Sequence, residues 1–79
     1  GIPRQIEGVE AGFTLTELQD GSTKISARTT KEVDAAAICG QLGGGGHVRA
    51  AGATIACDTQ EAIRRILAAT ERVYRGETA

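Results

Sequence analysis

The sequence predicts an α+β domain in which helices cover one face of a small mixed β-sheet. Apolar and polar residues alternate near the start, as in half-buried strands, and two later segments repeat apolar residues every three to four positions, as helices do. A run of four glycines separates the two helical segments. The expected order is strand, strand, helix, glycine loop, strand, helix, and the 79 residues form one domain, 1–79, with a small core.

Two strands should open the domain. Residues 8–17 alternate, and their apolar set is Val9, Ala11, Phe13 and Leu15. The segment QDGST supplies Asp-Gly turn chemistry, so the next segment, TKISART, should return as an antiparallel partner. In that strand Ile25 and Ala27 are expected to face the core. The opposite face carries Lys24, Ser26 and Arg28.

The first helix is expected to begin near Thr29, because Thr29 and Glu32 have the spacing of a capping box. Its apolar positions recur at helical spacing: Val33, Ala36, Ala37, Cys39 and Leu42. The glycine run should end it.

A third strand and a second helix are expected after Gly52. The segment ATIAC is typical of a short buried strand, and Asp58 with Glu61 repeats the capping pattern. Gly76 should end the helix. The expected inner stripe of this helix is Ile63, Ile66, Leu67, Thr70, Val73 and Tyr74.

The charge balance limits the kinds of partner. Nine basic and ten acidic residues create no global field for duplex nucleic acid or an anionic membrane, so any anion binding must be local. No apolar run is long enough to cross a membrane, and no signal peptide is visible. We expect a cytoplasmic location. Because the chain starts at Gly1 rather than Met, we also expect it to be a segment of a longer protein.

The two cysteines are expected to be free thiols. Cys39 and Cys57 form no CxxC pair and are too sparse for a secreted disulfide framework. A metal site that combined them with His47 would lack the paired spacings of zinc sites. We therefore expect no metal to be bound by this chain.

The glycine loop and the histidine after it, residues 43–47, need an explanation. Each ordered glycine costs roughly 0.5–1 kcal/mol relative to alanine, so four in a row must serve a purpose. One purpose is a tight turn with His47 simply exposed. The other is an anion-binding nest of main-chain N–H groups, strengthened by a helix N-terminus if HVRAA turns helically, with His47 donating at its rim. The residues alone leave both purposes open.

Arg28 is a second candidate for anion binding. Arginine suits bidentate contact with phosphate, although a surface salt bridge is an equally good reason for its presence. Arg49 either supplies another cation or faces water. Lys24 and Ser26 are weaker candidates on the strand face of Arg28.

The stretch VDAAAICGQLGGGGHVRAAGATI, preceded by KISART, closely resembles the C-terminal substrate-binding domain, of the DHHA1 type, in the DHH phosphoesterase family. The hallmark of that domain is a GGGGH loop followed by an Ala-Ala-Gly turn. The resemblance is closest to bacterial nano-RNases that also hydrolyse 3′-phosphoadenosine 5′-phosphate (pAp). RecJ-like exonucleases and cyclic dinucleotide phosphodiesterases are relatives. One departure is Thr16, near which close relatives often carry an arginine.

The resemblance implies a domain that closes over substrate held by an upstream DHH catalytic domain with a two-manganese centre. Arg28 matches a strand arginine that holds phosphate or base, and His47 would stabilise developing charge. The loop that contacts substrate is matched by Gly43, Gly44, Gly45, Gly46 and His47. The implied partners are short single-stranded RNA or DNA, or a nucleotide phosphate, with homodimerisation of the parent left open.

By itself the chain is expected to be inactive, because two-metal hydrolysis needs several carboxylates and imidazoles that converge, and this chain has one histidine. Two other classes of function stay open. One is a non-catalytic RNA-binding or assembly module, as in the C-terminal regions of alanyl-tRNA synthetases. The other is a structural or dimerisation domain without a ligand.

Overall fold

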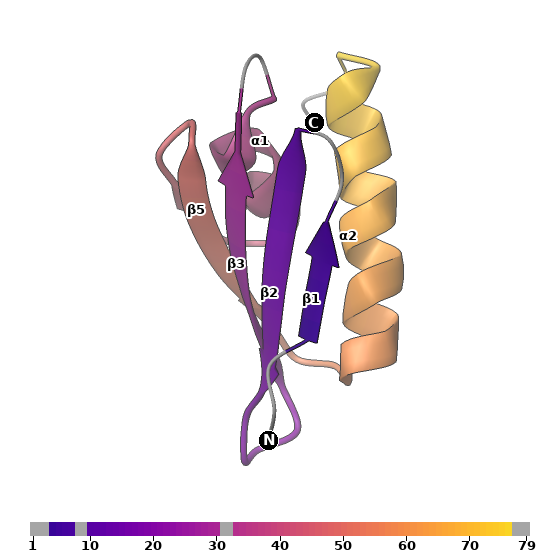
Figure 1. The fold of residues 1–79 in the computed structure, drawn as a ribbon. Helices are drawn as coiled ribbons and strands as arrows, with labels where there is room; N and C mark the ends of the chain where they lie inside the picture. Colours follow the sequence, from indigo (N-terminus) through magenta and orange to yellow (C-terminus); the bar gives the residue numbers. More distant parts are fainter. Residues whose placement is uncertain (1–3, 8–9, 31–32, 77–79) are drawn as a thin grey trace.

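The computed structural model describes residues 4–7, 10–30 and 33–76, and these form one sheet with helices on one of its faces (Figure 1). The strands are β1 (Arg4–Glu7), β2 (Ala11–Glu17), β3 (Thr23–Thr29), β4 (Gly45–Gly46) and β5 (Ala50–Ile55). The helices are α1 (Ala35–Gln41) and α2 (Thr59–Tyr74). The expected α+β class is confirmed.

The strand order in the sheet is β1-β2-β3-β5-β4, and every pairing among the described strands is antiparallel. The sequence had suggested a mixed sheet, and this part of the prediction is wrong. The reason is β4, which reverses the chain between α1 and β5. The hairpin of β4 and β5 brings β5 back antiparallel to β3.

Two short strands were missed. β1 has the sequence RQIE, in which Ile6 is the one apolar residue and packs against the core, so the strand offers too little alternation to be recognised. β4 consists of two glycines and has no side-chain pattern at all. The first predicted strand is confirmed from Ala11 to Glu17, and its expected start at Gly8 and Val9 lies outside the described residues.

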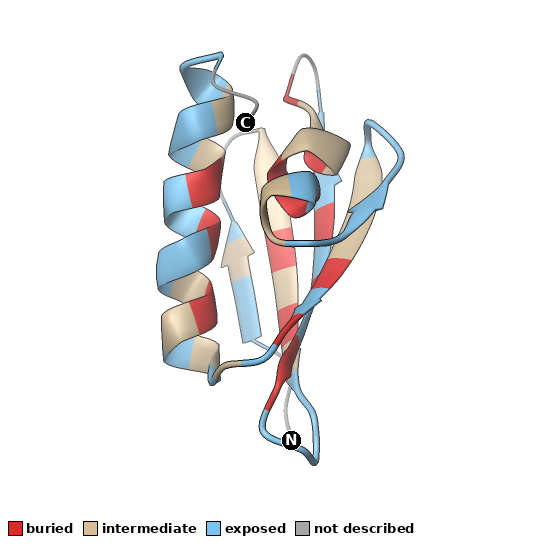
Figure 2. Cartoon of the chain, turned by 180° about the vertical axis from the view of Figure 1, so that it is seen from behind, coloured by how far each residue is buried: buried red, intermediate tan, exposed pale blue. Residues whose placement is uncertain are grey.

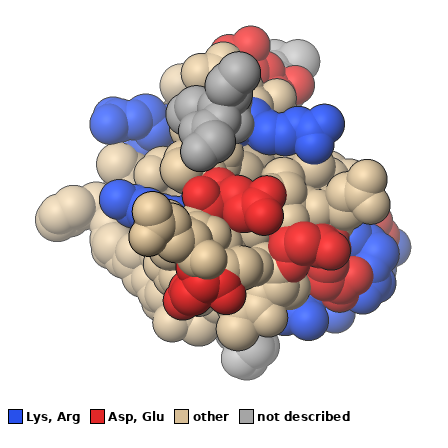
Figure 3. Space-filling model, turned by 90° about the horizontal axis from the view of Figure 1, so that it is seen from below, with Lys and Arg blue, Asp and Glu red and all other residues tan. Residues whose placement is uncertain are grey.

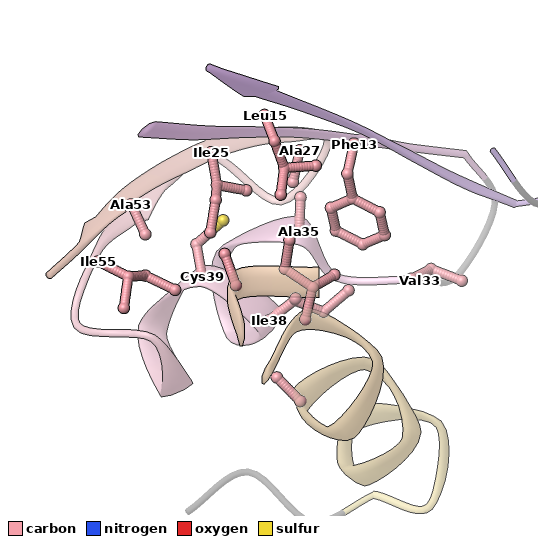
Figure 4. Packing of buried hydrophobic residues seen from close by; sticks show 13 residues of the cluster. Phe13, Leu15, Ile25, Ala27, Val33, Ala35, Ile38, Cys39, Ala53 and Ile55 are labelled. Atoms are coloured by element: carbon pink, nitrogen blue, oxygen red, sulfur yellow. The ribbon is translucent and has the colours of Figure 1, made fainter. Parts of the chain in front are cut away.

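The core lies between one face of the sheet and the two helices. Figure 4 shows Phe13, Leu15 and Ile25 of the sheet directed toward the helix layer. Figure 2, seen from the helix side, shows that the buried positions of the helices face the sheet and each other. The buried apolar set is Phe13, Leu15, Ile25, Ala27, Val33, Ala35, Ile38, Cys39, Ala53, Ile55, Ala62, Ile66 and Ala69. Five of these thirteen are alanines, so the layers approach closely.

The start of α1 differs from the prediction. Asp34 caps the helix, and its side chain accepts a hydrogen bond from the Ala37 N–H at 3.1 Å. Thr29 instead ends β3, and Glu32 lies outside the described residues. Because the helix starts later, its buried face also shifts to Ala35, Ile38 and Cys39.

The predicted boundaries of α2 are confirmed. The Asp58 carboxylate accepts from the Glu61 N–H at 2.9 Å, and Gly76 has a φ of +80°, which favours glycine after a helix. The predicted inner stripe is wrong in part, since Leu67 is 55% exposed and Tyr74 is 58% exposed. The fully buried positions of α2 are Ala62, Ile66 and Ala69.

The hairpin between β2 and β3 has the expected turn. Gly21 has a φ of +89°, and the Asp20 carboxylate accepts hydrogen bonds from both the hydroxyl and the N–H of Ser22. These bonds lower the pKa of the Asp20 carboxyl, the hydroxyl contributing most.

The outer surface carries both signs of charge. Figure 3 shows acidic and basic side chains interspersed on the face it presents. In the described part of the chain, neither helix is long and apolar enough to cross a membrane.

Candidate functional site

The sheet face opposite the helices, here called the open face, carries the candidate side chains. Along β3 burial alternates strictly, with the odd-numbered residues buried and Lys24, Ser26 and Arg28 exposed. Side chains of directly paired residues point to the same face of a sheet. The pairing register therefore identifies which residues lie beside Arg28.

One row of the sheet joins Arg28 to His47. Arg28 pairs with Ala50 of β5, and Ala50 exchanges two main-chain hydrogen bonds with His47, at 2.8 and 3.2 Å. On its other side Arg28 pairs with Gly12, and Gly12 pairs with Glu7. The row thus reads Glu7, Gly12, Arg28, Ala50, His47. With strands about 4.8 Å apart, the main chains at Arg28 and His47 are separated by roughly 10 Å across the small Ala50.

The Arg28 side chain has no hydrogen bond or ion pair with any residue that the structure describes. By contrast, Arg49 and the four arginines of the α2 segment all have partners. Those partners are the Val33 carbonyl for Arg49, Glu61 for Arg64 and Arg65, Gln41 for Arg72 and Glu71 for Arg75. Within the described residues the salt-bridge explanation of Arg28 therefore finds no partner, and its five donors face solvent.

The first two glycines of the loop serve α1. The Gly43 N–H donates to the Gly40 carbonyl at 3.2 Å, and the Gly44 N–H donates to the Cys39 carbonyl at 2.8 Å. Gly43 also has a φ of +87°, the left-handed conformation that ends many helices. These two N–H groups are therefore occupied, and they do not contribute to the nest of main-chain donors that was one of the two possible purposes of the loop.

The segment after the glycines is not helical either, so no helix N-terminus strengthens anion binding at the loop. Residues 45–46 and 50–55 form a hairpin, with Val48 and Arg49 at its tip. Because His47 and Ala50 are a hydrogen-bonded pair, the neighbouring pair of Gly46 and Ala51 is a non-hydrogen-bonded one. The Gly46 N–H therefore points away from β5, toward the outer edge of the sheet, and is a single main-chain donor near His47.

Packing explains two of the glycines in this hairpin. A Cβ at Gly44 would lie 2.1 Å from the Gly52 carbonyl oxygen, and one at Gly46 would lie 2.6 Å from the Cα of Ala51. Gly46 also has a φ of +148°. Gly45 is different, because its φ is not positive and a Cβ there would meet nothing within 4 Å.

Gly45 therefore has no internal reason to be glycine. It pairs with Gly52, which pairs with Ser26 on β3. Together with Ala50 these residues make the open face between Arg28 and His47 almost free of side chains. A ligand lying there can approach the main chain closely, with Arg28 on one side and His47 on the other.

The turn that carries His47 is held by residues of the covered face. The Val48 carbonyl accepts from the Ala35 N–H at 2.8 Å and from the Thr29 hydroxyl at 3.1 Å. The Thr29 N–H donates to the Arg49 carbonyl at 3.1 Å. Sequence reasoning treated Thr29 as a helix cap, and nothing in the sequence reveals that it positions this turn from 19 residues away.

Arg49 has a structural role rather than a place on the open face. Its guanidinium donates to the Val33 carbonyl at 2.8 Å and so ties the hairpin tip to the start of α1. Of the candidate residues, the structure thus brings Arg28, Gly45 and His47 together and assigns Gly43, Gly44 and Arg49 to holding the loop.

Both cysteines are free, with Cys39 buried and Cys57 half-buried. Burial raises the pKa of the Cys39 thiol, which keeps it protonated. Among the described residues, no three histidine, cysteine or acidic side chains lie close enough together to hold a metal ion.

Residues 1–76 match the model of the DHHA1 domain family.

The chain belongs to the DHHA1 domain family.

Two known proteins that are similar to this chain are phosphoesterases by name. The chain is 35% identical over 74 residues to the cyclic-di-AMP phosphodiesterase PdeA of Listeria monocytogenes. It is 41% identical over 70 residues to the bifunctional oligoribonuclease and PAP phosphatase NrnA of Thermus thermophilus. These matches confirm the resemblance inferred from the GGGGH loop.

The matches cover most of this DHHA1 chain and little of the relatives. They span 92% and 87% of the chain, but 11% of PdeA and 21% of NrnA. The chain therefore corresponds to about a fifth, or less, of the length of these proteins.

Proposed function

We propose that this DHHA1 chain binds the phosphate of a nucleotide or of a short single-stranded nucleic acid, and positions it for hydrolysis by a DHH catalytic domain. The observation that carries the proposal is the sheet row in which the unpartnered Arg28 lies across Ala50 from His47. The floor between them is formed by alanine and glycine. The names of the relatives, a phosphodiesterase and an oligoribonuclease, support the same class of substrate.

The proposed mechanism divides the work between two domains. Arg28 makes a bidentate contact with a phosphate oxygen pair, and the imidazole of His47 donates to an oxygen on which charge develops. Gly45 allows the phosphodiester to approach the main chain, and the edge-facing Gly46 N–H adds one donor. Manganese, expected in the catalytic domain, would supply the activated water. This chain holds and orients the substrate.

The contribution of Arg28 to ligand affinity can be separated from the effect of removing any positive charge from this face. A charge-assisted hydrogen bond contributes about 1.5–3 kcal/mol, so Arg28→Gln should weaken binding of a phosphorylated dinucleotide by roughly 10- to 100-fold. The matched control is Lys24→Gln, which removes a cation from the same strand and the same face, in a different row. It should change the affinity by less than about threefold at physiological salt.

The test is a titration of the isotope-labelled chain with 5′-phosphorylated diadenylate, followed by amide and side-chain NMR shifts. We expect shifts at Arg28, Gly45, Gly46 and His47, and no hydrolysis when Mn²⁺ is added to the chain alone. Shifts of equal size in the Arg28→Gln and Lys24→Gln variants would contradict the proposal. Unmoved resonances at millimolar ligand would instead favour a structural or assembly module.

A further inference from the structure

The side of α2 that faces away from α1 carries an apolar stripe that the described chain leaves uncovered. The stripe consists of Ile63, Leu67, Thr70 and Tyr74. Leu67 is 55% exposed and Tyr74 58%, while the other two members are half-buried. Arg72, on the opposite side of the helix, hydrogen-bonds to Gln41 of α1. The stripe therefore points outward, at the end of the sheet where β1 is the edge strand (Figure 1).

The spacing of the stripe is that of a coiled-coil seam. Its residues follow one another at intervals of four, three and four positions, as successive d and a positions of a heptad do. The core face of the same helix is formed by other residues, Ala62, Ile66 and Ala69. α2 therefore has two apolar faces, of which its own domain uses one. The second has the pattern by which helices pack against other helices.

The charges beside the stripe are complementary to themselves under a two-fold rotation. Arg64 and Glu71 border it on the solvent side, at the e position of successive heptads, and their side chains are 73% and 60% exposed. In an antiparallel pair of helices in which Leu67 meets Thr70 of a second copy, Arg64 lies beside Glu71 of that copy. The two-fold axis repeats this contact, so two ion pairs form.

A parallel pair of helices offers no such contact. There the e position faces the g position of the other helix, and the g positions of α2 are Ile66 and Val73, which pack in the domain's own core. The ion pairs within α2 do not prevent the exchange. Arg64 is bonded to Glu61, but Glu61 also accepts a hydrogen bond from Arg65 and so keeps a cationic partner.

We propose that this face of α2 is a homodimer interface, in which two copies of the chain pack α2 against α2 in antiparallel orientation. The apolar stripe forms the seam, and the two ion pairs between Arg64 and Glu71 fix its register and direction. The open face lies on the other side of the sheet, so each copy keeps its proposed phosphate site accessible. The dimer does not depend on the proposed function.

The first experiment measures the mass of the chain by sedimentation velocity over a range of concentrations. A seam of four residues per helix is smaller than a standard interface, so we expect a weak dimer with a dissociation constant of roughly 10–500 μM. Leu67→Gln removes the centre of the seam from both copies and should weaken the dimer by roughly 30- to 100-fold. Because Leu67 is largely exposed, the melting temperature of the dilute monomer should stay the same.

Charge reversal tests the antiparallel orientation. Arg64→Glu and Glu71→Arg each bring like charges together in both contacts, so each variant alone should dimerise roughly tenfold more weakly. An equimolar mixture of the two variants brings opposite charges together in both contacts and should recover the wild-type affinity as a heterodimer. Arg65→Glu is the matched control, because it also takes a cation from Glu61 but lies away from the stripe. It should leave the dimer unchanged.

Three results would contradict the proposal. A chain that stays monomeric at about 1 mM does not use the stripe for a second copy. A dimer that Leu67→Gln leaves intact is formed by another surface. If the mixture of the two charge-reversed variants associates no better than either variant alone, the helices are not antiparallel. Because no variant alters Arg28 or His47, none of these results bears on the phosphate site.

Discussion

The two faces of the sheet obey different rules, although they are built from the same strands. On the covered face each residue is explained by its neighbours: Ile25 is fully buried, and Thr29 hydrogen-bonds to the turn at Val48. On the open face Gly12, Arg28 and Gly45 have no such explanation within the described chain. The difference teaches that residues which the fold does not need are the ones to examine for a ligand.

The sharpest test of this contrast uses two adjacent residues of β3. Ile25→Ala removes a fully buried side chain and should cost about 3–4 kcal/mol of the free energy of unfolding. Ser26→Ala, on the open face, should cost no more than about 0.5 kcal/mol. Urea denaturation followed by circular dichroism measures both. Equal losses would mean that the open face is also structurally constrained.

Gly44 and Gly45 of the glycine loop show the same contrast, since the fold requires the first to be glycine and not the second. Gly44→Ala places a Cβ 2.1 Å from the Gly52 carbonyl oxygen, so the hairpin must shift and stability should fall by about 3 kcal/mol. Gly45→Ala meets open space and should change stability by no more than about 0.5 kcal/mol.

Ligand binding should respond in the opposite way. Gly45→Ala is expected to weaken binding of 5′-phosphorylated diadenylate measurably, since its methyl group would occupy the floor of the site. A stable Gly45→Ala variant with unchanged affinity would show that this glycine is not reserved for a ligand.

Thr29 links the two faces, because its buried hydroxyl holds the turn next to His47. Thr29→Val keeps the shape and removes one hydrogen bond, which should cost about 1 kcal/mol. Thr23→Val is the matched control, since its hydroxyl bonds the Cys57 carbonyl at 2.8 Å from the same face of the same strand. Both variants should lose similar stability by thermal denaturation.

Only Thr29→Val should also weaken nucleotide binding and speed hydrogen exchange at the Ala50 amide, which donates to the His47 carbonyl. If Thr23→Val weakens binding to the same extent, the loss comes from general instability, and Thr29 has no positioning role.

Much of the covered face could be predicted from the sequence. The alternation of residues 11–17 and the cap at Asp58 are local signals, and both were read correctly. The α1 cap at Asp34 is equally local, but the Thr29–Glu32 spacing was chosen in its place. The strand β4 was missed because it depends on packing between distant segments, such as the approach of Gly44 to Gly52.

The candidate site divides in the same way. The GGGGH loop identified the family, and the polar face of β3 pointed to Arg28. The placement of Arg28 and His47 in one row could not be predicted, because it requires the β4–β5 hairpin, where the sequence predicted only a glycine loop. A hollow above Gly12, which Glu7 and Arg28 line, could not be predicted either, since Glu7 belongs to the unrecognised β1.

The smallest expected effect on stability is that of charged residues on the solvent-facing side of α2, which neither pack in the core nor lie at the proposed ligand site. Hydrogen bonds from Arg64, and then from Arg65, lower the pKa of Glu61 from 4.5 to about 2. A carboxyl whose pKa is depressed in the folded state stabilises the fold above its unfolded pKa, and loses that contribution as the pH falls through the folded value.

The melting-temperature difference between the wild type and Glu61→Gln should therefore be constant above about pH 5 and shrink between pH 4.5 and 2. In a background carrying Arg64→Gln and Arg65→Gln, this pH dependence should largely disappear. If it persists there, the stabilisation comes from the position of Glu61 in the first turn of the helix rather than from its arginine partners.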